Sequence, residues 1–295
     1  MNISIIGASG FLGKNLISYL LLNTEHNISA IALDTKNIII EDKYKNRVKI
    51  IEANAFNYND MKVALIGTDV AFYFIHMLCY KNNFYKKESE VAHIVGKALY
   101  ETNVKKVIYM SGLGNDQDKL SDHLSSRHKT GQILSEYINQ VIEFRASMII
   151  GSGSASFEII RDIVSKAPFI ILPSTAKNET QPIGLSDALL YLTSSINLIN
   201  KESLIIEIGG PETMSYQELL EEYGNFINKK VYIIIIPFLT KRLAGLLLGF
   251  FTSKDRSTIG QNMVESFKNK MIVTNNKAIK LYPKIIPKKI KNSFF

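Results

Sequence analysis

The stretch ISIIGASGFLGKNLISYL, residues 3–20, decides the fold. A short apolar run leads into Gly7, and Gly7, Gly10 and Gly13 then form the spacing G-x-x-G-x-x-G at the start of a helical pattern. Glycines allow the backbone to approach a pyrophosphate closely, and a helix N-terminus offers unpaired N–H groups and a partial positive charge. Gly13 also lets the helix pack closely on the sheet. The stretch therefore predicts a strand, a phosphate-binding turn and a helix, which together begin a dinucleotide-binding unit.

The rest of the chain continues this alternation of strands and helices. We predict strands at Asn2–Ile6, Ile28–Leu33, Val48–Glu52, Val70–Ile75, Val107–Ser111 and Val141–Arg145, and helices at Leu12–Leu22, Tyr58–Leu65, Phe84–Glu101 and Leu124–Ile138. Such βαβ units favour an α/β fold with a doubly wound parallel sheet of the Rossmann type. We expect a dinucleotide-binding Rossmann domain at residues 1–150 and a small C-terminal α/β lobe for a substrate or partner at 151–295, integrated with the sheet.

Past about residue 150 the alternation is looser. Helices are predicted at Phe157–Ser165 and Ser186–Asn197, and a late strand at Ile205–Ile208. Ser215 begins a further helix, because Glu218 three residues later completes a capping box.

Asp34 is the residue that distinguishes the two nicotinamide cofactors. It follows the second predicted strand, 21 residues after Gly13, where a carboxylate accepts hydrogen bonds from the adenosine ribose. The same carboxylate would repel a 2′-phosphate, so we expect NAD to be preferred over NADP, although Lys36 nearby weakens the argument. The alternative is a turn aspartate with no ligand. Asn54, after the third strand, is placed to meet the adenine.

Composition excludes several classes of protein. With 46 % apolar and 21 % charged residues among 295, most of the chain is expected to fold as a globule. The single cysteine, Cys79, excludes an internal disulfide and a multi-cysteine metal site, which fits a reducing compartment, and we expect no metal. The net charge of +8 comes largely from six lysines in residues 277–291, so we expect no nucleic-acid partner.

The segment Val231–Phe251 is the one membrane-like stretch. Lys241 and Arg242 interrupt it, and two charges at mid-bilayer would cost several kcal/mol, so we expect a strand followed by a buried helix. Membrane contact is not expected, and the protein is predicted to be cytoplasmic. The apolar positions of that helix, Leu243, Leu246, Leu247, Phe250 and Phe251, predict that it packs on the cofactor lobe. The tail from Lys284 onward is predicted to be exposed and dispensable for nucleotide binding.

Several motifs resemble one family. They are GASGFLG at Gly7–Gly13, DVAFYFIHML at Asp69–Leu78, VIYMSGLG at Val107–Gly114, HLSSRHKTGQIL at His123–Leu134, FRASMIIGSGSASFE at Phe144–Glu158, TQPIGLSD at Thr180–Asp187 and EIGGPETMSYQEL at Glu207–Leu219. To about residue 220 the chain resembles the atypical short-chain dehydrogenases/reductases, in the NmrA-like branch that includes an accessory subunit of respiratory complex I. The resemblance implies an extended Rossmann fold with a small lobe closing over an NAD(P) cofactor. It implies cofactor contacts from Gly7, Ser9, Gly10, Phe11, Leu12, Gly13, Asp34, Asn54, Ile75 and His76.

Catalytic members of this superfamily use a serine together with a Tyr-x-x-x-Lys pair. Ser111 matches the serine, but His123 and Arg127 stand at the tyrosine and lysine positions. Imidazole titrates near ~6.5 and a phenol near ~10, and an adjacent guanidinium lowers the imidazole pKa further. Arginine does not titrate, but it can fork onto ribose hydroxyls or a phosphate.

Two interpretations of these catalytic candidates stay open. Ser111, His123 and Arg127 support an altered oxidoreductase or epimerase reaction on a carbonyl, quinone or nucleotide-sugar substrate. Alternatively, the chain has lost redox catalysis and acts as a cofactor-binding sensor or assembly protein, which the complex I relative favours. A plain helix start at His123 and Arg127 is the third alternative. The expected partners are the dinucleotide and an unidentified small molecule or protein.

Overall fold

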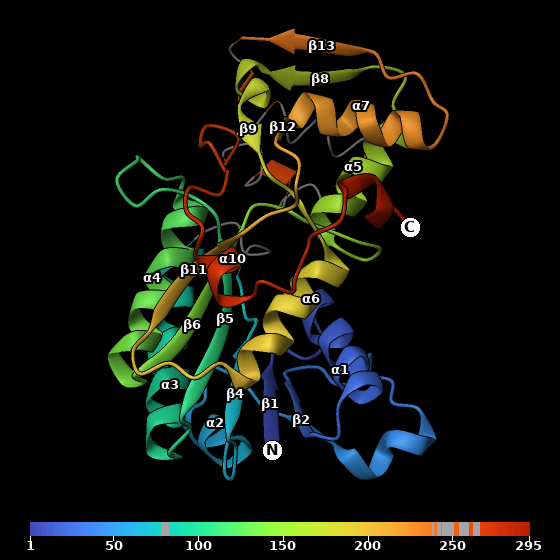
Figure 1. The fold of residues 1–295 in the computed structure, drawn as a ribbon. Coiled ribbons are helices and arrows are strands. Elements are labelled where there is room, and N and C mark those ends of the chain that lie inside the picture. The colour runs from blue at the N-terminus through green and yellow to red at the C-terminus, as the bar shows by residue number, and fades with distance from the viewer. Residues whose placement is uncertain (78–82, 238, 241–242, 244–250, 254–259, 262–265) are drawn as a thin grey trace.

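A seven-stranded parallel sheet forms the centre of the molecule (Figure 1) in the part of the chain that the computed structural model describes, residues 1–77, 83–237, 239–240, 243, 251–253, 260–261 and 266–295. Its strands are β1 (Asn2–Ile6), β2 (Asn27–Ala32), β3 (Val48–Glu52), β4 (Val70–Tyr73), β5 (Lys106–Gly112), β6 (Gln140–Ala146) and β11 (Leu204–Ile208). Their order across the sheet is β11-β6-β5-β4-β1-β2-β3. The order reverses between β1 and β4, which makes their carboxyl ends the switch point where doubly wound sheets bind ligands.

Helices cover both faces of this sheet (Figure 1). One face packs against α1 (Phe11–Asn23), α6 (Leu185–Ser194) and α10 (Lys277–Leu281), and the other against α2 (Tyr58–Ala64), α3 (Phe84–Glu101) and α4 (Asp122–Tyr137). Because both faces are covered, the strands are apolar and almost continuously buried in the middle of the sheet, as in β4 and β5. The α/β fold expected from the sequence is confirmed.

The turn after β1 takes a backbone path that only glycine accommodates easily. Gly7 has φ +88°, and a Cβ there would lie 3.1 Å from the Phe74 carbonyl carbon. A Cβ on Gly13 would lie 2.5 Å from the Gly7 oxygen, so α1 could not approach the turn with any side chain at this position. The first and third glycines of the motif therefore fix the shape of the turn.

A buried lysine joins the two halves of the chain. Lys106, at the start of β5, donates to the carbonyls of Ser195 (3.3 Å), Ile196 (3.0 Å) and Leu198 (2.6 Å). These carbonyls end α6 and the 3₁₀ turn η3 (Ser195–Asn197), where helical carbonyls lack partners within the helix. Together with the pairing of β11 on β6, this contact makes the later segments part of the sheet layer.

The remaining elements form a layer at the carboxyl ends of the strands (Figure 1). They comprise β7 (Ile149–Ile150), α5 (Ala155–Lys166), β8 (Ile170–Pro173), η2 (Ser174–Lys177), β9 (Glu179–Thr180), β10 (Ile183–Gly184), β12 (Met214–Ser215), α7 (Tyr216–Phe226), β13 (Ile233–Ile236) and η4 (Ile290–Ser293), while η1 (Asp42–Arg47) precedes β3. Helices α5 and α7 pack together over their own apolar cluster. The expected capping box at Ser215 and Glu218 is present at the start of α7.

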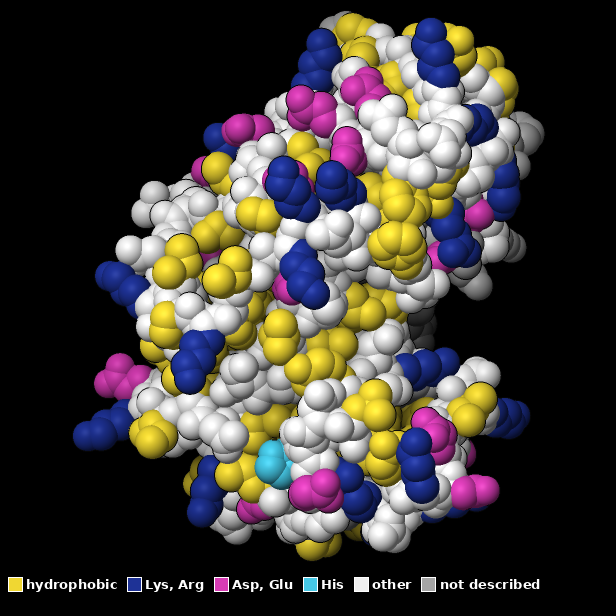
Figure 2. All heavy atoms as spheres, turned by 45° about the vertical axis from the view of Figure 1, so that its right-hand side comes forward, with side chains coloured by type: hydrophobic (Ala, Val, Ile, Leu, Met, Phe, Trp, Pro, Cys, Tyr) yellow, Lys and Arg dark blue, Asp and Glu magenta, His cyan; other side chains and the backbone are white. Residues whose placement is uncertain are grey.

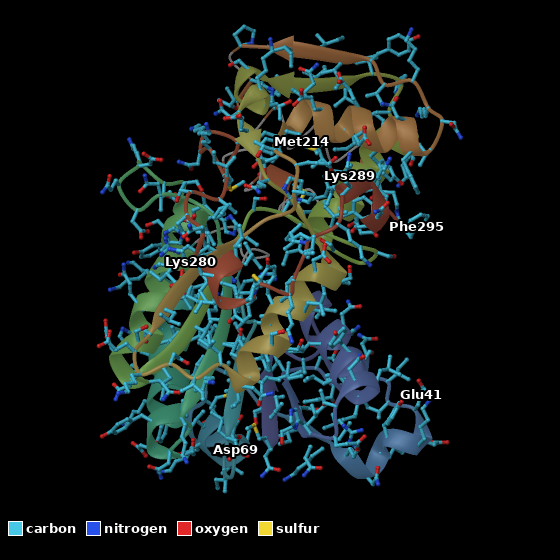
Figure 3. The ribbon with its side chains drawn as sticks, in the orientation of Figure 1. Glu41, Asp69, Met214, Lys280, Lys289 and Phe295 are labelled. Carbon is cyan, nitrogen blue, oxygen red and sulfur yellow. The ribbon has the colours of Figure 1, made fainter. Side chains whose placement is uncertain are left out.

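The C-terminal residues correct one sequence prediction. Lys288 N donates to Asp187 (2.8 Å), Ile290 N donates to Glu212 (3.1 Å), and the Ile290 and Phe294 side chains are buried. Figure 3 shows Lys289 and Phe295 beside α5 and α7, far from Lys280 at the sheet. The prediction of an exposed tail from Lys284 onward is therefore wrong for this segment, although its lysines do face solvent.

The structure shows how the surface charge is distributed (Figure 2), and it describes part of the membrane-like segment Val231–Phe251. Lysines and arginines on the face in Figure 2 are scattered among acidic and apolar side chains. Ile233–Ile236 forms the expected strand, whereas Leu246, Leu247 and Phe250 of the expected helix lie outside the described residues, as does Cys79. Within the described residues, no helix combines the length and apolar character that crossing a bilayer requires.

Candidate functional site

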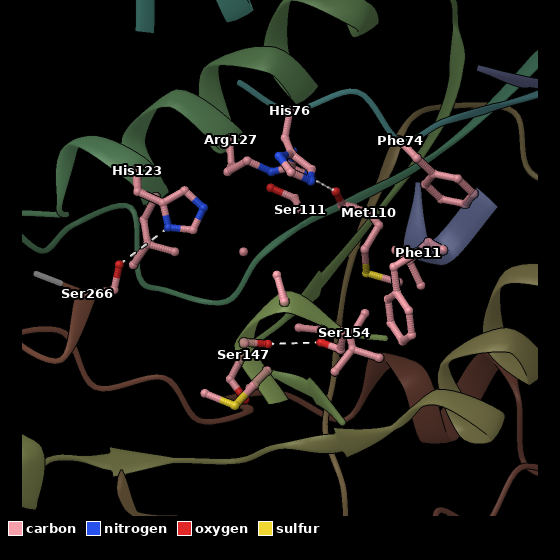
Figure 4. Close-up of a pocket in the computed structure, with 18 of the residues that line it drawn as sticks. Phe11, Phe74, His76, Met110, Ser111, His123, Arg127, Ser147, Ser154 and Ser266 are labelled. Carbon is pink, nitrogen blue, oxygen red and sulfur yellow. Dashed lines mark hydrogen bonds between the residues drawn. The ribbon is translucent and has the colours of Figure 1, made fainter. Parts of the chain in front are cut away.

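A cavity of about 400 Å³ opens at the switch point of the sheet (Figure 4). The glycine turn before α1 and the carboxyl ends of β4, β5 and β6 line one side of it, and the start of α4 lines another. Segments from the second half of the chain close it, namely the start of α5, Tyr216 of α7 and the segment around Phe267. The cavity therefore lies where the fold brings the two halves of the chain together.

The glycine turn presents a free helix N-terminus to this cavity. Gly10 is the N-cap of α1 and makes no side-chain cap, and no acidic residue lies in the first turn. Gly10, Phe11, Leu12 and Gly13 all line the cavity, so the unpaired N–H groups of the first helical turn lie at its wall. Such a terminus suits an anionic phosphate group.

Ser111 is the second-last residue of β5, at the cavity wall. Its side chain is buried beside the Tyr109 phenol, with which its hydroxyl interacts. The regular pairing of β5 with β6, in which Ser111 lies opposite Arg145, fixes its position. A serine hydroxyl is both a donor and an acceptor, so at this wall it can also bond with a ligand.

His123 lies on the first turn of α4, which Ser121 caps by accepting from Leu124 N. Its Nδ1 is 3.4 Å from the Ser266 hydroxyl, and the ring lines the cavity (Figure 4). Burial lowers the pKa of His123 to about 3, and the positive charge of Arg127 and the neighbouring histidines contribute further. The ring is therefore neutral near pH 7.

Arg127 lies one helical turn after His123, but its guanidinium is already engaged. It donates to the carbonyls of Ile75 (3.2 Å) and Met110, and it lies 5.0 Å from the centre of the Tyr109 ring. These bonds tie the chain after β4 to the end of β5. The guanidinium thus holds the two strand ends in place, and it also lines the cavity.

His76 follows β4 and lines the same cavity, next to Arg127 in Figure 4. The residue is exposed, and desolvation of its ring among the neighbouring side chains lowers its pKa to about 4, with a smaller effect from the Arg127 charge. The backbone beside it is held by Glu88, a buried carboxylate on α3 that accepts from Met77 N at 2.8 Å and from the Ser126 hydroxyl. The structure thus brings His76, Ser111, His123 and Arg127 together around one space.

The other predicted cofactor residues lie outside the cavity lining. Asp34 is exposed beyond the end of β2, and its carboxylate accepts from Lys36 N at 3.0 Å. The Asn54 side chain accepts from Phe56 N at 3.0 Å. Ser9 and Ile75 are adjacent in sequence to residues that do line the cavity, and Gly7 lies three residues before Gly10. Asp34 follows β2 and Asn54 follows β3, the two strands beyond β1 on the side toward which an adenosine would extend.

Several lining residues were not expected from the sequence. They are Ser147, Met148, Tyr216, Ser266, Phe267 and Met271. Four of the six lie more than 60 residues beyond the strands that carry the glycine turn and Ser111, and of these four only Tyr216 falls within a quoted motif. The nearest signal was the alternation of serines at Ser152, Ser154 and Ser156, of which the last two line the cavity.

Comparisons with known proteins agree with this geometry. The profile of a family described as NAD(P)H-binding matches residues 7–149. A sequence search of curated proteins finds no match.

Solved structures share the fold over the whole chain. A nucleoside-diphosphate-sugar epimerase from Staphylococcus aureus superposes with a TM-score of 0.77 at 14 % identity, covering 100 % of this chain and 99 % of the other. The NADPH-dependent quinone oxidoreductase of Escherichia coli, in complex with NADPH, gives 0.76 at 16 % identity, covering 99 % and 98 %. A UDP-glucose 4-epimerase from Thermotoga maritima with UDP-glucose gives 0.71 at 12 % identity, covering 100 % and 96 %. The TM-scores establish a common fold, and identities this low establish the fold alone.

Proposed function

Residues 7–149 form an NAD(P)H-binding domain, and from this premise we propose that the chain is a cofactor-binding sensor or assembly protein that has lost the usual proton chemistry of its superfamily. In this role, the chain binds the dinucleotide along the glycine turn and a second molecule in the adjoining cavity. In this proposal, residues 151–295 present a different surface to a partner when the cavity is occupied.

The observation that carries this proposal is the state of His123 and Arg127. A proton donor or acceptor works best when its pKa lies near the working pH, and His123 has a pKa of about 3. The neutral imidazole is a poor acid, and its conjugate acid is scarcely populated. Arg127 directs donors at two backbone carbonyls, so it does not stand in for a lysine that binds the ribose.

A second candidate function is an NAD(P)H-dependent oxidoreductase or epimerase that runs without a tyrosine. Ser111 favours it, because its hydroxyl lies at the wall of the cavity that the glycine turn also lines and can donate to a carbonyl oxygen. Solvent or another group would then supply the proton. The structural neighbours include both an epimerase and a quinone oxidoreductase, which is compatible with this candidate.

The same proposal covers the choice of cofactor and the division of labour. We infer that Asp34 makes NAD the preferred cofactor, through the repulsion between its carboxylate and a 2′-phosphate. Residues 1–150 serve the dinucleotide, and residues 151–295 serve the substrate or partner.

Binding and turnover measurements separate the two candidates. Nicotinamide fluorescence should change when the protein is titrated into NADH, and the absence of tryptophan keeps protein emission low. The NADH complex is then offered carbonyls, quinones and nucleotide sugars in turn, and oxidation is followed by absorbance. The sensor proposal expects binding without turnover.

Variants at the cavity decide the matter if turnover is seen. Reproducible turnover that disappears in Ser111→Ala, with NADH binding retained, would establish the oxidoreductase candidate instead. If NADH fluorescence does not respond to the unmodified protein at all, both candidates fail.

A further inference from the structure

A second hollow, of about 440 Å³, lies on the sheet and shares no lining residue with the cofactor cavity. Its wall comes from α4 and its floor from β6 and β11, within residues 131–136, 141–143 and 203–205. Figure 1 shows α4 beside β6 and β11 at the left of the molecule. Because α4 packs on β5 and β6 while β11 is the edge strand, the face of the sheet extends past this helix. We call this hollow the edge groove.

Glu143 brings a buried carboxylate to the edge groove. Its side chain is 5 % exposed, and its Oε1 accepts from Arg145 Nε at 2.7 Å. A side chain on Gly131 would collide with Glu143 Oε2, so this second oxygen lies in the space that the glycine leaves at the groove wall. In the part of the chain that the structure describes, Oε2 accepts no hydrogen bond. A carboxylate has room for donors at both oxygens, and a buried one that lacks them is costly.

The charged groups around Glu143 leave it short of positive charge. Arg145 is shared, because its Nη1 donates to Asp116 Oδ2 at 2.9 Å. Asp116 also bonds to His128, and Glu136 adds a further carboxylate at the groove wall. Even with His128 counted as a cation, three carboxylates face two cations. The described lining of the groove contains no lysine, arginine or histidine that would restore the balance.

Apolar side chains lie beside the carboxylate. Ile205 is opposite Glu143 in the register of β6 and β11, and Val141 lies two residues before Glu143 on the same face of the sheet. Ile205 is 40 % exposed. Lys277 approaches from beyond the sheet edge, where it donates to the Ile205 carbonyl and remains exposed to solvent, which screens its charge. The groove therefore combines an apolar floor with one buried negative charge.

An alkyl cation matches this combination, because it lays an aliphatic stem on apolar surface while its charged end bonds to a carboxylate. We propose that the edge groove binds such a cation, a guanidinium or ammonium group on a short aliphatic stem, whose N–H donors bond to Glu143 Oε2 while the stem lies on Ile205. The inference goes beyond the proposed function and does not depend on it. The same group occurs in free small amines and guanidines and in lysine or arginine side chains of other proteins, and the test separates these sources.

Binding of n-butylguanidinium to the full-length protein tests the proposal, followed by ligand-observed NMR with and without saturating NADH. Butanol and butyrate are the comparisons, because they carry a similar stem with a neutral or a negative end. We expect the guanidinium to bind at least about tenfold more tightly than either comparison, as for one charge-assisted hydrogen bond. NADH should leave its affinity unchanged, because the groove and the cavity are separate.

A capped tripeptide, acetyl-Gly-Arg-Gly-amide, distinguishes the two sources of the cation. It presents the same guanidinium in the form in which a protein side chain would deliver it. Tighter binding of the tripeptide than of n-butylguanidinium would assign the group to a partner protein. Tighter binding of the free cation would assign it to a small molecule, and either result supports the site.

The variant Ile205→Lys supplies a competing ammonium group from within the chain. The new amine lies opposite Glu143, so the affinity for n-butylguanidinium should fall at least about tenfold. The pair of Glu143 and Arg145 stays intact in this variant, and its melting temperature should be no lower than that of the unmodified chain. Ile199→Lys is the matched control, because it adds the same charge at a residue that is 97 % exposed and outside the groove lining. It should change the affinity by less than about twofold.

Three results would overturn the inference. One is that neither guanidinium probe binds more tightly than butanol, and another is that the folded Ile205→Lys variant binds n-butylguanidinium as tightly as the unmodified protein. The third is displacement of the guanidinium by NADH, which would place it in the cofactor cavity instead. A failure to bind NADH would contradict the proposed function alone, because the guanidinium is also measured without NADH.

Discussion

The half-buried His123 makes the stability of the fold depend on pH. Its folded-state pKa is about 3, lowered chiefly by desolvation, against about 6.5 when unfolded. The unfolded chain therefore binds more protons as pH falls below about 6.5, and the folded state loses stability from there down to the folded pKa. His123 contributes up to about 1.4 kcal/mol per pH unit within that window.

Replacing His123 with glutamine should flatten this dependence. In urea unfolding at pH 7 and pH 5, we expect the free energy of unfolding of His123→Gln to fall by about 1–2 kcal/mol less than that of the unmodified protein. His93→Gln is the control, since His93 is exposed on α3. Identical slopes for His123→Gln and the unmodified chain would show that His123 is charged in the folded state.

The Asp34 side chain governs the proposed cofactor preference. We expect NADH to bind more tightly than NADPH, and Asp34→Ala together with Leu33→Arg to reduce or reverse the difference. Leu33 is 67 % exposed, so arginine enters without disturbing the core. Fluorescence titrations with both cofactors measure the ratio, and equal affinities in the unmodified protein would mean that Asp34 serves only its turn with Lys36.

At the level of single residues, sequence spacing predicted which side chains lie at the cavity but not which hydrogen bonds they make. The positions of Ser111, His123 and Arg127 followed from their motif, and they do meet at one cavity. The engagement of Arg127 with two carbonyls was not readable, because its acceptors lie 17 and 52 residues away in the chain. Ser147 escaped notice because a serine after a strand carries no signal of its burial.

Helix α3 positions the cavity through one buried carboxylate. Glu88→Ala would leave Met77 N–H and the Ser126 hydroxyl without their acceptor, which should cost about 1–3 kcal/mol of unfolding free energy. Since Met77 follows His76, the affinity for NADH should fall as well. Urea unfolding and NADH titration test both effects.

Glu90→Ala provides the matched control, because Glu90 is exposed on the same helix and has similar helix propensity. It should change stability by less than about 0.5 kcal/mol. An equal effect of the two substitutions would show that α3 is held by its apolar face alone.

Long periodic elements were predictable, and short ones were not. The helix at Phe84–Glu101 agrees with the sequence pattern at both ends. Strand β4 ends at Tyr73, two residues before the predicted end, because the chain leaves the sheet there to carry His76 into the cavity. Two-residue strands such as β7 and β10 have no periodicity that a sequence could display, since long-range pairing alone creates them.

At the scale of the whole molecule, the C-terminal segment completes the apolar cluster between α5 and α7. Phe294 is buried, stacks on Phe157 with centres 5.7 Å apart, and meets the Tyr223 ring edge-on at 5.3 Å. Phe294→Ala should therefore lower the free energy of unfolding by about 3–5 kcal/mol.

The neighbouring Phe295 is the control, because its side chain is 81 % exposed. Phe295→Ala should change stability by less than about 0.5 kcal/mol. Chemical denaturation of both variants measures the difference, and similar values would show that the segment is as dispensable as its lysines suggested.

Composition misled at this scale. Six lysines in residues 277–291 predict a solvated end, and the lysine side chains are in fact exposed. Two apolar side chains, Ile290 and Phe294, decide the outcome instead, and their four-residue spacing is too short a pattern to outweigh the surrounding charge. The parallel sheet, in contrast, was predictable because the strands of the first half alternate with helices, apart from the η1 connection between β2 and β3.

Because Lys106 donates to three carbonyls, the rate at which its amine becomes reactive reports how often the molecule opens. An acylating reagent modifies exposed Lys105 at once, whereas the Lys106 nitrogen is shielded until β5 separates from the end of α6. The ratio of label on these adjacent residues, read by mass spectrometry after a short pulse, therefore counts the molecules that have opened. Ligands that strengthen the contact between the two halves should lower the rate at which Lys106 is labelled.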